Sequence, residues 1–164
     1  MLCRQMIMIA LTGFLAMALQ ASAQPSQRTY VVLDAEDCEV RALEKGSLRL
    51  VSPGVMDGEY VEFTCVPQDV QNPQGEVIGK AAYLSTAVRV DCRKQTFSLV
   101  RTTFYREDGS VLLVETYPGG QEGWLHDATT KFVRLACSQR LQKRYPGKTY
   151  ASPAEFLAVV RRSF

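Results

Sequence analysis

Apolar and polar side chains alternate along several short stretches of the chain. In the segment EYVEFTCV, Val61, Phe63 and Cys65 occupy every second position, which is the period-two pattern of a strand with one buried face. Extended runs at Tyr30–Leu33 and Ser47–Val51 predict two further strands. We expect Cys65 on the buried face of its strand, where a disulfide bond is protected.

A β-hairpin is predicted around the pair Asp108–Gly109, which favours the positive φ angles of a tight two-residue turn. With that pair at the centre of the turn, Phe104 lies opposite Leu113 and Tyr105 lies opposite Leu112. Apolar side chains then occupy both faces of the hairpin near its turn. We therefore expect the hairpin to be central in the sheet, covered by a helix on one face and partly covered on the other.

The segment from Pro67 to Lys80 contains two prolines, two glycines and few large apolar side chains. This composition predicts one long loop, and loops of this length are more often functional or mobile than incidental. The segment is the second candidate for a contact surface. The extended pattern resumes between Ala82 and Cys92.

Helical periodicity replaces alternation in the last third of the chain. Apolar residues recur every three or four positions between about Thr129 and Lys143, with Asp127 as a candidate N-cap. The segment Ser152–Glu155 has the form of a capping box with proline at the first helical position, and it begins a final helix that reaches about Arg161. The predicted fold class is therefore α+β, an antiparallel β-sheet packed against one or two C-terminal helices and stapled by disulfides.

The first residues have the order of a secretory signal peptide. One positive charge at Arg4 precedes the uncharged, mostly apolar run Met6–Leu19, and a small-x-small ending at Ala21–Ala23 marks a cleavage site. This run of about 14 residues is shorter than the roughly 20 that a membrane-spanning helix requires. We therefore favour a cleaved signal peptide over residues 1–23, with a retained membrane anchor as the alternative.

The mature chain is long enough for one domain, which we expect over residues 24–145, followed by a capped helix within 146–164. Cys3 leaves with the signal peptide, and the four cysteines that remain are Cys38, Cys65, Cys92 and Cys137. An even number in an exported chain indicates two disulfides. Of the three possible pairings we prefer Cys38–Cys65 and Cys92–Cys137, which keep each bridge within one half of the chain. A zinc site needs close cysteine pairs, and the nearest cysteines are 27 positions apart, so we expect neither metal nor cofactor.

Charge is unevenly distributed along the sequence. Residues 131–164 hold eight basic side chains and one acidic one, whereas residues 24–130 hold ten basic and sixteen acidic ones. Such polarity can guide an anionic partner, for example an anionic glycan, to one end of a protein; the alternative is a solvated helical face. Stacking aromatics do not interleave with these basic residues, so nucleic acid is not expected. The candidate binding patch comprises Arg140, Lys143, Arg144, Lys148, Arg161 and Arg162.

Candidate catalytic residues are few. His126 is the only histidine, and the sequence contains no GxSxG, HExxH or P-loop motif that would give it a catalytic setting. The loop Tyr117–Gly120 with Trp124 could recognise a ligand or pack over the hairpin, and we favour packing. An acidic turn could cut glycosidic bonds or hold calcium, but it lacks the EF-hand spacing, and a solvated turn is the simpler interpretation. This turn contains Asp34, Glu36, Asp37 and Glu39.

One combination of segments resembles a known family. A strand ending in VDC (Val90–Cys92) is followed by the strand TFSLVRTTFY (Thr96–Tyr105), a turn, a second strand, the pair Gly123–Trp124 and the helix ATTKFVRLAC (Ala128–Cys137). Over residues 88–137 this arrangement resembles the bacterial surface-adhesion protein E-like domain, in which a hairpin that starts with DC leads to a helix that ends in AC.

The resemblance implies an antiparallel sheet packed against a helix, a disulfide between Cys92 and Cys137, and a capacity to dimerise. It also implies an envelope protein of a Gram-negative bacterium, located in the periplasm or on the outer cell surface. The adhesin of this family binds host matrix and serum proteins, although no binding residue transfers to a position here. No cysteine follows the apolar run as a lipid-attachment site would require, and residues 139–164 lie beyond the matching region.

Three functions follow from these observations. We favour a non-catalytic binding module of the envelope or extracellular surface, using the sheet, the long loop or the basic helical end to bind a host matrix or serum protein. The alternative is a periplasmic accessory or inhibitory subunit that docks onto another envelope protein, for example through Phe156, Val159 and Val160 of the last helix. The least favoured function is a small hydrolase that uses His126 or the acidic turn.

Overall fold

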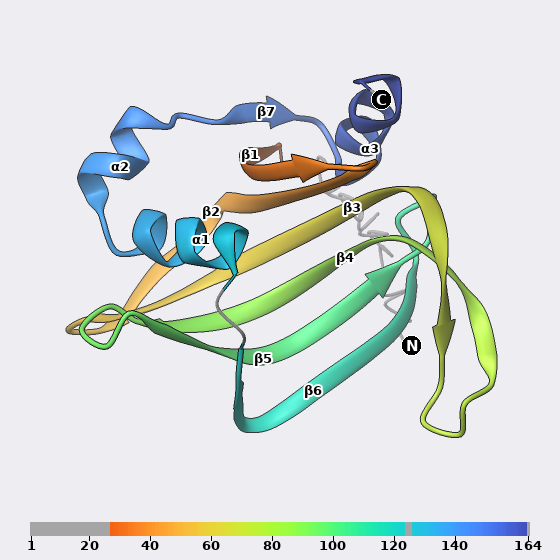
Figure 1. Cartoon of the computed structure of the whole chain (residues 1–164), viewed down its shortest axis with the longest axis horizontal. Helices are drawn as coiled ribbons and strands as arrows, with labels where there is room; N and C mark the ends of the chain where they lie inside the picture. The colour runs from red at the N-terminus through yellow and green to blue at the C-terminus, as the bar shows by residue number, and fades with distance from the viewer. Residues whose placement is uncertain (1–26, 124–125, 164) are drawn as a thin grey trace, which may run out of the picture.

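The computed structural model describes residues 27–123 and 126–163, and the predicted signal peptide lies outside them. The main element is a seven-stranded antiparallel sheet with strand order β6-β5-β4-β3-β2-β1-β7 (Figure 1). Its strands are β1 (Arg28–Glu36), β2 (Glu39–Ser52), β3 (Val55–Gln71), β4 (Val77–Asp91), β5 (Thr96–Tyr105), β6 (Val111–Glu122) and β7 (Lys148–Tyr150). The helices are α1 (Asp127–Ala136), α2 (Gln139–Arg144) and α3 (Pro153–Ser163). The antiparallel sheet with C-terminal helices agrees with the predicted architecture, although strands dominate. None of the helices in the described residues is long and apolar enough to cross a membrane.

Each face of the sheet packs against a different helix. On one face, called the α1 face, Tyr60 packs with Phe132 of α1. On the opposite face, called the α3 face, Val61 and Phe63 pack with Phe156 of α3. Adjacent residues of β3 belong to different cores because side chains alternate along a strand. The period-two pattern separates these faces correctly, but Tyr60 is only 9% exposed, so β3 is buried on both faces.

The predicted single helix from Thr129 to Lys143 is wrong, because the chain leaves the helical path between α1 and α2. Cys137 ends α1 and is bonded to Cys92. Ser138 then begins α2 as its N-cap, and its hydroxyl accepts a hydrogen bond from the Leu141 N–H at 3.3 Å. A serine at this position satisfies a backbone donor that has no partner inside the helix, so the break is stabilised locally.

Both disulfides are formed in the structure, with the pairing that the sequence analysis prefers. Cys38 in the β1–β2 turn bonds to Cys65 of β3, and Cys92 after β4 bonds to Cys137 after α1. The Cys65 N–H also donates a hydrogen bond to the Cys38 carbonyl at 2.9 Å. One bridge therefore ties the first hairpin to β3, and the other ties the end of α1 to the sheet.

The C-terminal tail is part of the same sheet and core. Strand β7 pairs with the start of β1, where Tyr30 lies opposite Lys148. Helix α3 begins as its capping box predicts, since the Glu155 N–H donates to the Ser152 hydroxyl at 3.2 Å. Phe156 then stacks on Tyr30, with 4.8 Å between ring centroids. The tail thus closes one end of the α3 face.

The predicted long loop from Pro67 to Lys80 is wrong. Strand β3 continues to Gln71 and β4 begins at Val77, so residues 72–76 alone connect them. The β3–β4 register shifts between Phe63 and Gln68, which places Pro67 in a bulge. A residue without an N–H is tolerated there because no ladder hydrogen bond is lost.

The turn of the β5–β6 hairpin differs from the predicted two-residue turn. The Arg106 N–H donates to the Ser110 carbonyl at 2.9 Å, and the Gly109 N–H donates to the Arg106 carbonyl at 3.0 Å. Gly109 has a positive φ of 82°, whereas Asp108 is not among the residues with positive φ. These bonds enclose a three-residue loop, in which glycine takes the left-handed position.

The predicted position of this hairpin is also wrong, because β6 is an edge strand of the sheet. Phe104 lies opposite Leu113 as predicted, but Tyr105 lies opposite Val111 because the longer loop shifts the pairing by one residue. Val111 and Val114 are 52% and 47% exposed. Apolar side chains on both faces near the turn therefore reflect an open edge and not a central strand.

Candidate functional site

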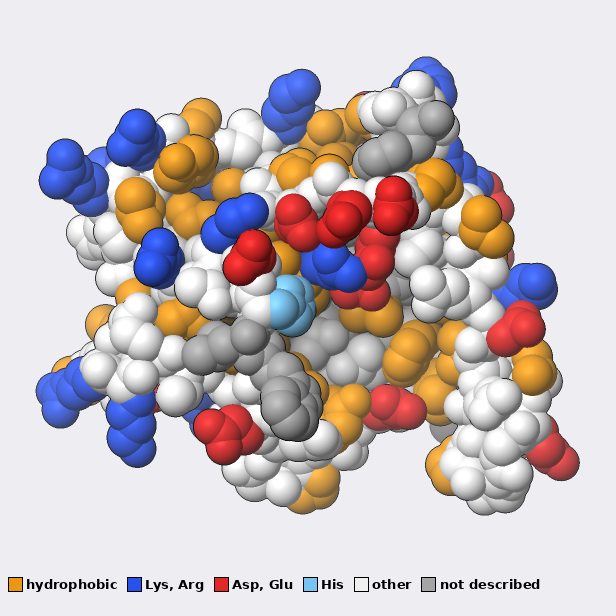
Figure 2. Space-filling view, in the orientation of Figure 1, with side chains coloured by type: hydrophobic (Ala, Val, Ile, Leu, Met, Phe, Trp, Pro, Cys, Tyr) orange, Lys and Arg blue, Asp and Glu red, His pale blue; other side chains and the backbone are white. Residues whose placement is uncertain are grey.

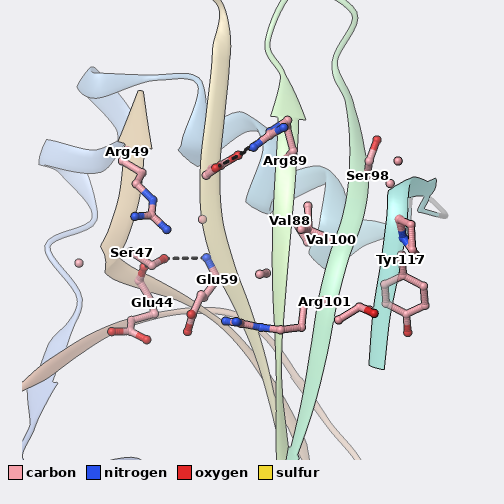
Figure 3. A pocket seen from close by; sticks show the side chains of 18 of the residues that line it. Glu44, Ser47, Arg49, Glu59, Val88, Arg89, Ser98, Val100, Arg101 and Tyr117 are labelled. Atoms are coloured by element: carbon pink, nitrogen blue, oxygen red, sulfur yellow. Dashed lines mark hydrogen bonds and ion pairs between the residues drawn. The ribbon is translucent and has the colours of Figure 1, made fainter. Parts of the chain in front are cut away.

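A groove of about 840 Å³ opens on the α3 face, beyond the end of the sheet that α3 covers (Figure 3). It extends across β2, β3, β4 and β5 to the β6 edge. Its lining comprises Arg28, Glu44, Gly46, Ser47, Arg49, Asp57, Gly58, Glu59, Ala87, Val88, Arg89, Ser98, Val100, Arg101, Thr116, Tyr117, Pro118, Gly119 and Gly120.

The groove exists because the apolar stripe on the α3 face stops partway along each strand. On β3, Val61 and Phe63 lie beneath α3, whereas the next two residues on the same face are Glu59 and Asp57. A helix placed over these carboxylates would remove charges from water, which costs several kcal/mol per uncompensated ion. Helix α3 therefore covers the apolar end of this face, and the charged end remains open.

Three charged side chains and one serine form a first row across the floor, called the first charged row. Arg49 lies opposite Asp57, Asp57 lies opposite Arg89, and Arg89 lies opposite Ser98 in the strand registers. Arg89 binds both carboxylate oxygens of Asp57, with Nε–Oδ1 and Nη2–Oδ2 distances of 2.8 and 3.1 Å. Asp57 is thus occupied by Arg89 in a two-bond pair, the strongest geometry for these groups.

A second charged row lies beside the first. Glu44 lies opposite Glu59, and Ala87 separates Glu59 from Arg101. Arg28 reaches this row from β1, with Nη1 2.8 Å from Glu44 Oε2 and 3.9 Å from Glu59 Oε2. Burial raises the pKa of Glu44 above its usual range, the nearby Glu59 carboxylate adds to that rise, and Arg28 opposes it. One cation therefore serves both carboxylates of the second row.

Arg49 and Arg101 are the two arginines of the groove that take no part in these ion pairs. Within the described residues, neither makes an ion pair or a side-chain hydrogen bond. Both are exposed, and both side chains point into the groove, Arg49 from β2 and Arg101 from β5 (Figure 3). The sequence does not bring these two residues together, because they belong to strands that are far apart along the chain. The signal that it does carry is a charged residue at alternate positions of each strand.

The loop Tyr117–Gly120 forms the rim of the groove at the sheet edge. Leu99 of β5 lies opposite Gln121 whereas Arg101 lies opposite Thr116, so these four residues bulge out of β6. Gly119 and Gly120 have φ angles of 80° and 81°, which glycine adopts without steric cost. The loop named in the sequence analysis thus borders the groove, and its Trp124 lies outside the described residues.

The opposite face carries a separate charged cluster around Arg41, where acidic side chains surround a basic one (Figure 2). The guanidinium lies 2.7 Å from Glu39 and 3.4 Å from both Asp34 and Glu62. Burial, together with the hydrogen bond and charge of Glu39, raises the pKa of Glu62 to about 7, against the opposing effect of Arg41. Two members of the predicted acidic turn therefore pair with Arg41, and the other two are exposed: Glu36 and Asp37.

The predicted basic patch is divided in the structure. Three of its residues lie on α2, Lys148 lies on β7, and two lie on α3, and these helices are at opposite ends of the β7 segment (Figure 1). Arg161 of α3 pairs with Glu107 in the β5–β6 turn. The residues that remain together are Arg140, Lys143 and Arg144, all exposed on α2.

His126 occupies the N-cap of α1, a position that the sequence analysis gives to Asp127. Its backbone N–H donates to the Thr129 hydroxyl at 2.8 Å. In the part of the chain that the structure describes, no group of three or more His, Cys, Asp or Glu side chains is arranged to hold a metal ion. The role visible for His126 is to begin a helix.

Comparisons with known proteins give weak structural similarity and no sequence match. No family model and no curated protein matches the chain. The structure of protein E from non-typeable Haemophilus influenzae has a TM-score of 0.46 and is 13% identical, covering 83% of this chain and 90% of that one. A second structure of Haemophilus influenzae protein E has a TM-score of 0.44 at 18% identity, covering 71% of this chain and 86% of that one. TM-scores below 0.5 at these identities do not establish a family for this chain.

Proposed function

We propose that this protein is an exported, non-catalytic binding module of the bacterial envelope, and that its partner docks in the groove of the α3 face. The partner is a host matrix or serum component, or another envelope component. The observation that carries the proposal is a large open groove with unpaired cations, built on a sheet whose covered parts are closed by helices. Binding residues on strands are held more rigidly than residues on loops.

Export is supported by the two disulfides and by the order of the first 23 residues. Structural disulfides form and persist in oxidising compartments such as the periplasm and the cell surface. The bonds Cys38–Cys65 and Cys92–Cys137 each close a long segment of chain. A protein that works outside the cytoplasm gains stability from both.

The alternative function, docking of α3 onto another envelope protein, has less support. Phe156 and Val160 of the proposed apolar stripe are 3% and 4% exposed, because they pack against the core of the same chain. Val159 alone is half-buried. A partner would have to displace α3 before it could use this stripe.

The proposal has a further part, in which the edge strand β6 pairs with a second copy of this protein. Its exposed Val111 and Val114 lie on an edge whose backbone groups are open to another strand. Sedimentation of the mature protein tests this part. A dimer that Val114→Lys converts to a monomer supports it, and a monomeric wild type at high concentration contradicts it.

The binding function is tested by filling the groove. Ala87 lies in the floor of the groove, between Glu59 and Arg101 in the second charged row, so Ala87→Trp should abolish binding of the mature protein to immobilised matrix and serum proteins and to envelope extract. Val77→Trp is the matched control, because Val77 is 56% exposed and outside the groove. Binding that survives Ala87→Trp, or that Val77→Trp removes equally, would contradict the proposal. Protease treatment of intact cells then separates a surface location, where the protein is digested, from a periplasmic one.

A further inference from the structure

We propose that the groove recognises an acidic polysaccharide, and that Arg49 and Arg101 bind its carboxylate or sulfate groups. This inference rests on the proposed function, since it names the chemistry of the partner that docks in the groove. It also moves the anionic-glycan site from the basic C-terminal end, where the sequence analysis expects it, to the α3 face.

The charge balance of the groove is the first reason. Four guanidiniums line it against three carboxylates, and the pairs described above leave two guanidiniums without a partner among the described residues. A planar guanidinium donates two parallel hydrogen bonds to a carboxylate or sulfate. A groove between low-dielectric walls also strengthens the attraction of an opposite charge. The surplus positive charge therefore lies in a groove where an external anion can bind it.

The geometry of the two rows is the second reason. Asp57 of the first row and Glu59 of the second are two residues apart on β3, so the rows are separated by about 7 Å. In Figure 3, Arg49 enters the groove from the β2 side beside the first row, and Arg101 reaches from the β5 side along the second row toward Glu59. An anionic chain that crosses both rows meets both guanidiniums, whereas a single small ion meets fewer partners.

The lining favours a sugar chain over a peptide. Strands β2 to β5 of the floor already pair with one another, so their backbone groups cannot add a peptide strand as an open edge can. The apolar lining side chains Ala87, Val88, Val100, Tyr117 and Pro118 are set among seven charged ones, whereas an anchor residue of a peptide favours a pocket with an apolar centre. The Arg89–Asp57 pair and the hydroxyl of Ser98 instead offer donors and acceptors that suit sugar hydroxyls.

The basic end of the chain provides the competing site and hence the control. Arg140 and Arg144 are exposed on a short helix, where solvent and salt screen their charge. The double variants Arg49→Gln/Arg101→Gln and Arg140→Gln/Arg144→Gln remove the same charge from the two sites. A difference between them therefore reports position and not net charge.

The test measures binding of heparin and hyaluronan to the mature protein by calorimetry at two salt concentrations. We expect the groove variant to lose at least about tenfold in affinity and the α2 variant to lose less than about threefold. Equal losses, or a larger loss for the α2 variant, would overturn the assignment. Binding of heparin alone would identify sulfate as the recognised group, and binding of both would show that carboxylate suffices; each supports the inference.

Three further outcomes separate this inference from the proposed function. Polyglutamate that binds as tightly as heparin, and that also depends on Arg49 and Arg101, would replace the polysaccharide with an acidic peptide. If neither polysaccharide binds while matrix or envelope proteins still bind in a manner that Ala87→Trp abolishes, the polysaccharide inference fails and the proposed function stands. If nothing binds in the groove, both fail.

Discussion

The two faces of the sheet carry charged clusters of opposite balance. On the α1 face, one guanidinium, Arg41, serves three carboxylates, and Glu62 has its pKa raised to about 7 by burial and by Glu39. On the α3 face, Arg49 and Arg101 remain without partners in the described residues. The raised pKa of Glu62 lets the first cluster reduce its negative surplus by binding a proton, whereas an external anion would neutralise the positive surplus of the second. The difference supports the proposal that the second cluster is a binding surface.

The apolar packing of the two faces shows the same contrast. On the α1 face, helix α1 lies over the sheet and is tied to it by Cys92–Cys137. On the α3 face, α3 covers Tyr30 and Phe63 and leaves the charged end open. The closed face should therefore determine stability, and the open end should determine binding.

The largest loss of stability should come from removing the disulfide of the α1 face with the double variant Cys92→Ser/Cys137→Ser. The bond spans 45 residues, and closing a loop of that length is worth about 4 kcal/mol in the chain-entropy model. Urea unfolding followed by circular dichroism measures the loss. The matched variant Cys38→Ser/Cys65→Ser opens a span of 27 residues and should lose about 3.5 kcal/mol. A clearly larger loss from the second variant would show that packing alone holds α1.

The next effect should come from the covered end of the α3 face. Phe156 is 3% exposed and meets Phe63 edge-on at 4.6 Å between ring centroids, so Phe156→Ala should lower the free energy of unfolding by about 3 kcal/mol. Val159→Ala, on the same helix and only half-buried, should cost about 1 kcal/mol. Thermal unfolding of both variants decides this point, and equal small losses would mean that α3 is not part of the core.

A smaller effect should appear as a dependence of stability on pH. Because the folded-state pKa of Glu62 is raised to about 7 from its usual 4.5, the folded state binds this proton more tightly than the unfolded state. The resulting stabilisation is complete below about pH 4.5 and is lost as the pH rises through 7, and about 2.5 kcal/mol of it is lost between pH 5 and pH 8. Glu62→Gln should remove most of the difference in unfolding free energy between pH 5 and pH 8, whereas Glu36→Gln in the exposed turn should leave it. Wild-type stability that rises from pH 5 to pH 8 would contradict this assignment.

The smallest effect on stability should come from the groove itself. Arg49 and Arg101 have no ion pair or side-chain hydrogen bond to lose in the part of the chain that the structure describes, so the double glutamine variant should change the free energy of unfolding by less than about 0.5 kcal/mol. The same variant should lose its ligand. Chemical denaturation checks the first statement, and a loss well above this value would mean that the two arginines support the fold and not a partner.

The sequence predicted the features that depend on local pattern, such as the alternation along β3 and the capping box of α3. The preferred cysteine pairing, which joins distant segments, also matches the structure. Features that depend on strand order and register were missed. Pro67 looked like a loop residue because its bulge exists only against β4, and the β5–β6 hairpin looked central because apolar side chains on an exposed edge resemble buried ones.

The groove could not be derived from the sequence for the same reason. Arg49 and Arg101 are separated by 52 positions, and only the order of the strands brings them to one surface. The run of basic residues near the C-terminus was conspicuous in sequence but is divided between α2, β7 and α3. Clustering along the chain therefore does not give one continuous patch in the structure.

The most direct test of the groove is to map where an acidic oligosaccharide binds. Backbone amide NMR signals of the mature protein are recorded while a heparin hexasaccharide is added. We expect the largest shifts at Arg49, Ala87 and Arg101 on the α3 face, with small shifts on α2. Shifts concentrated at Arg140 and Lys143, with the groove unchanged, would contradict the assignment of the α3 face as the binding surface.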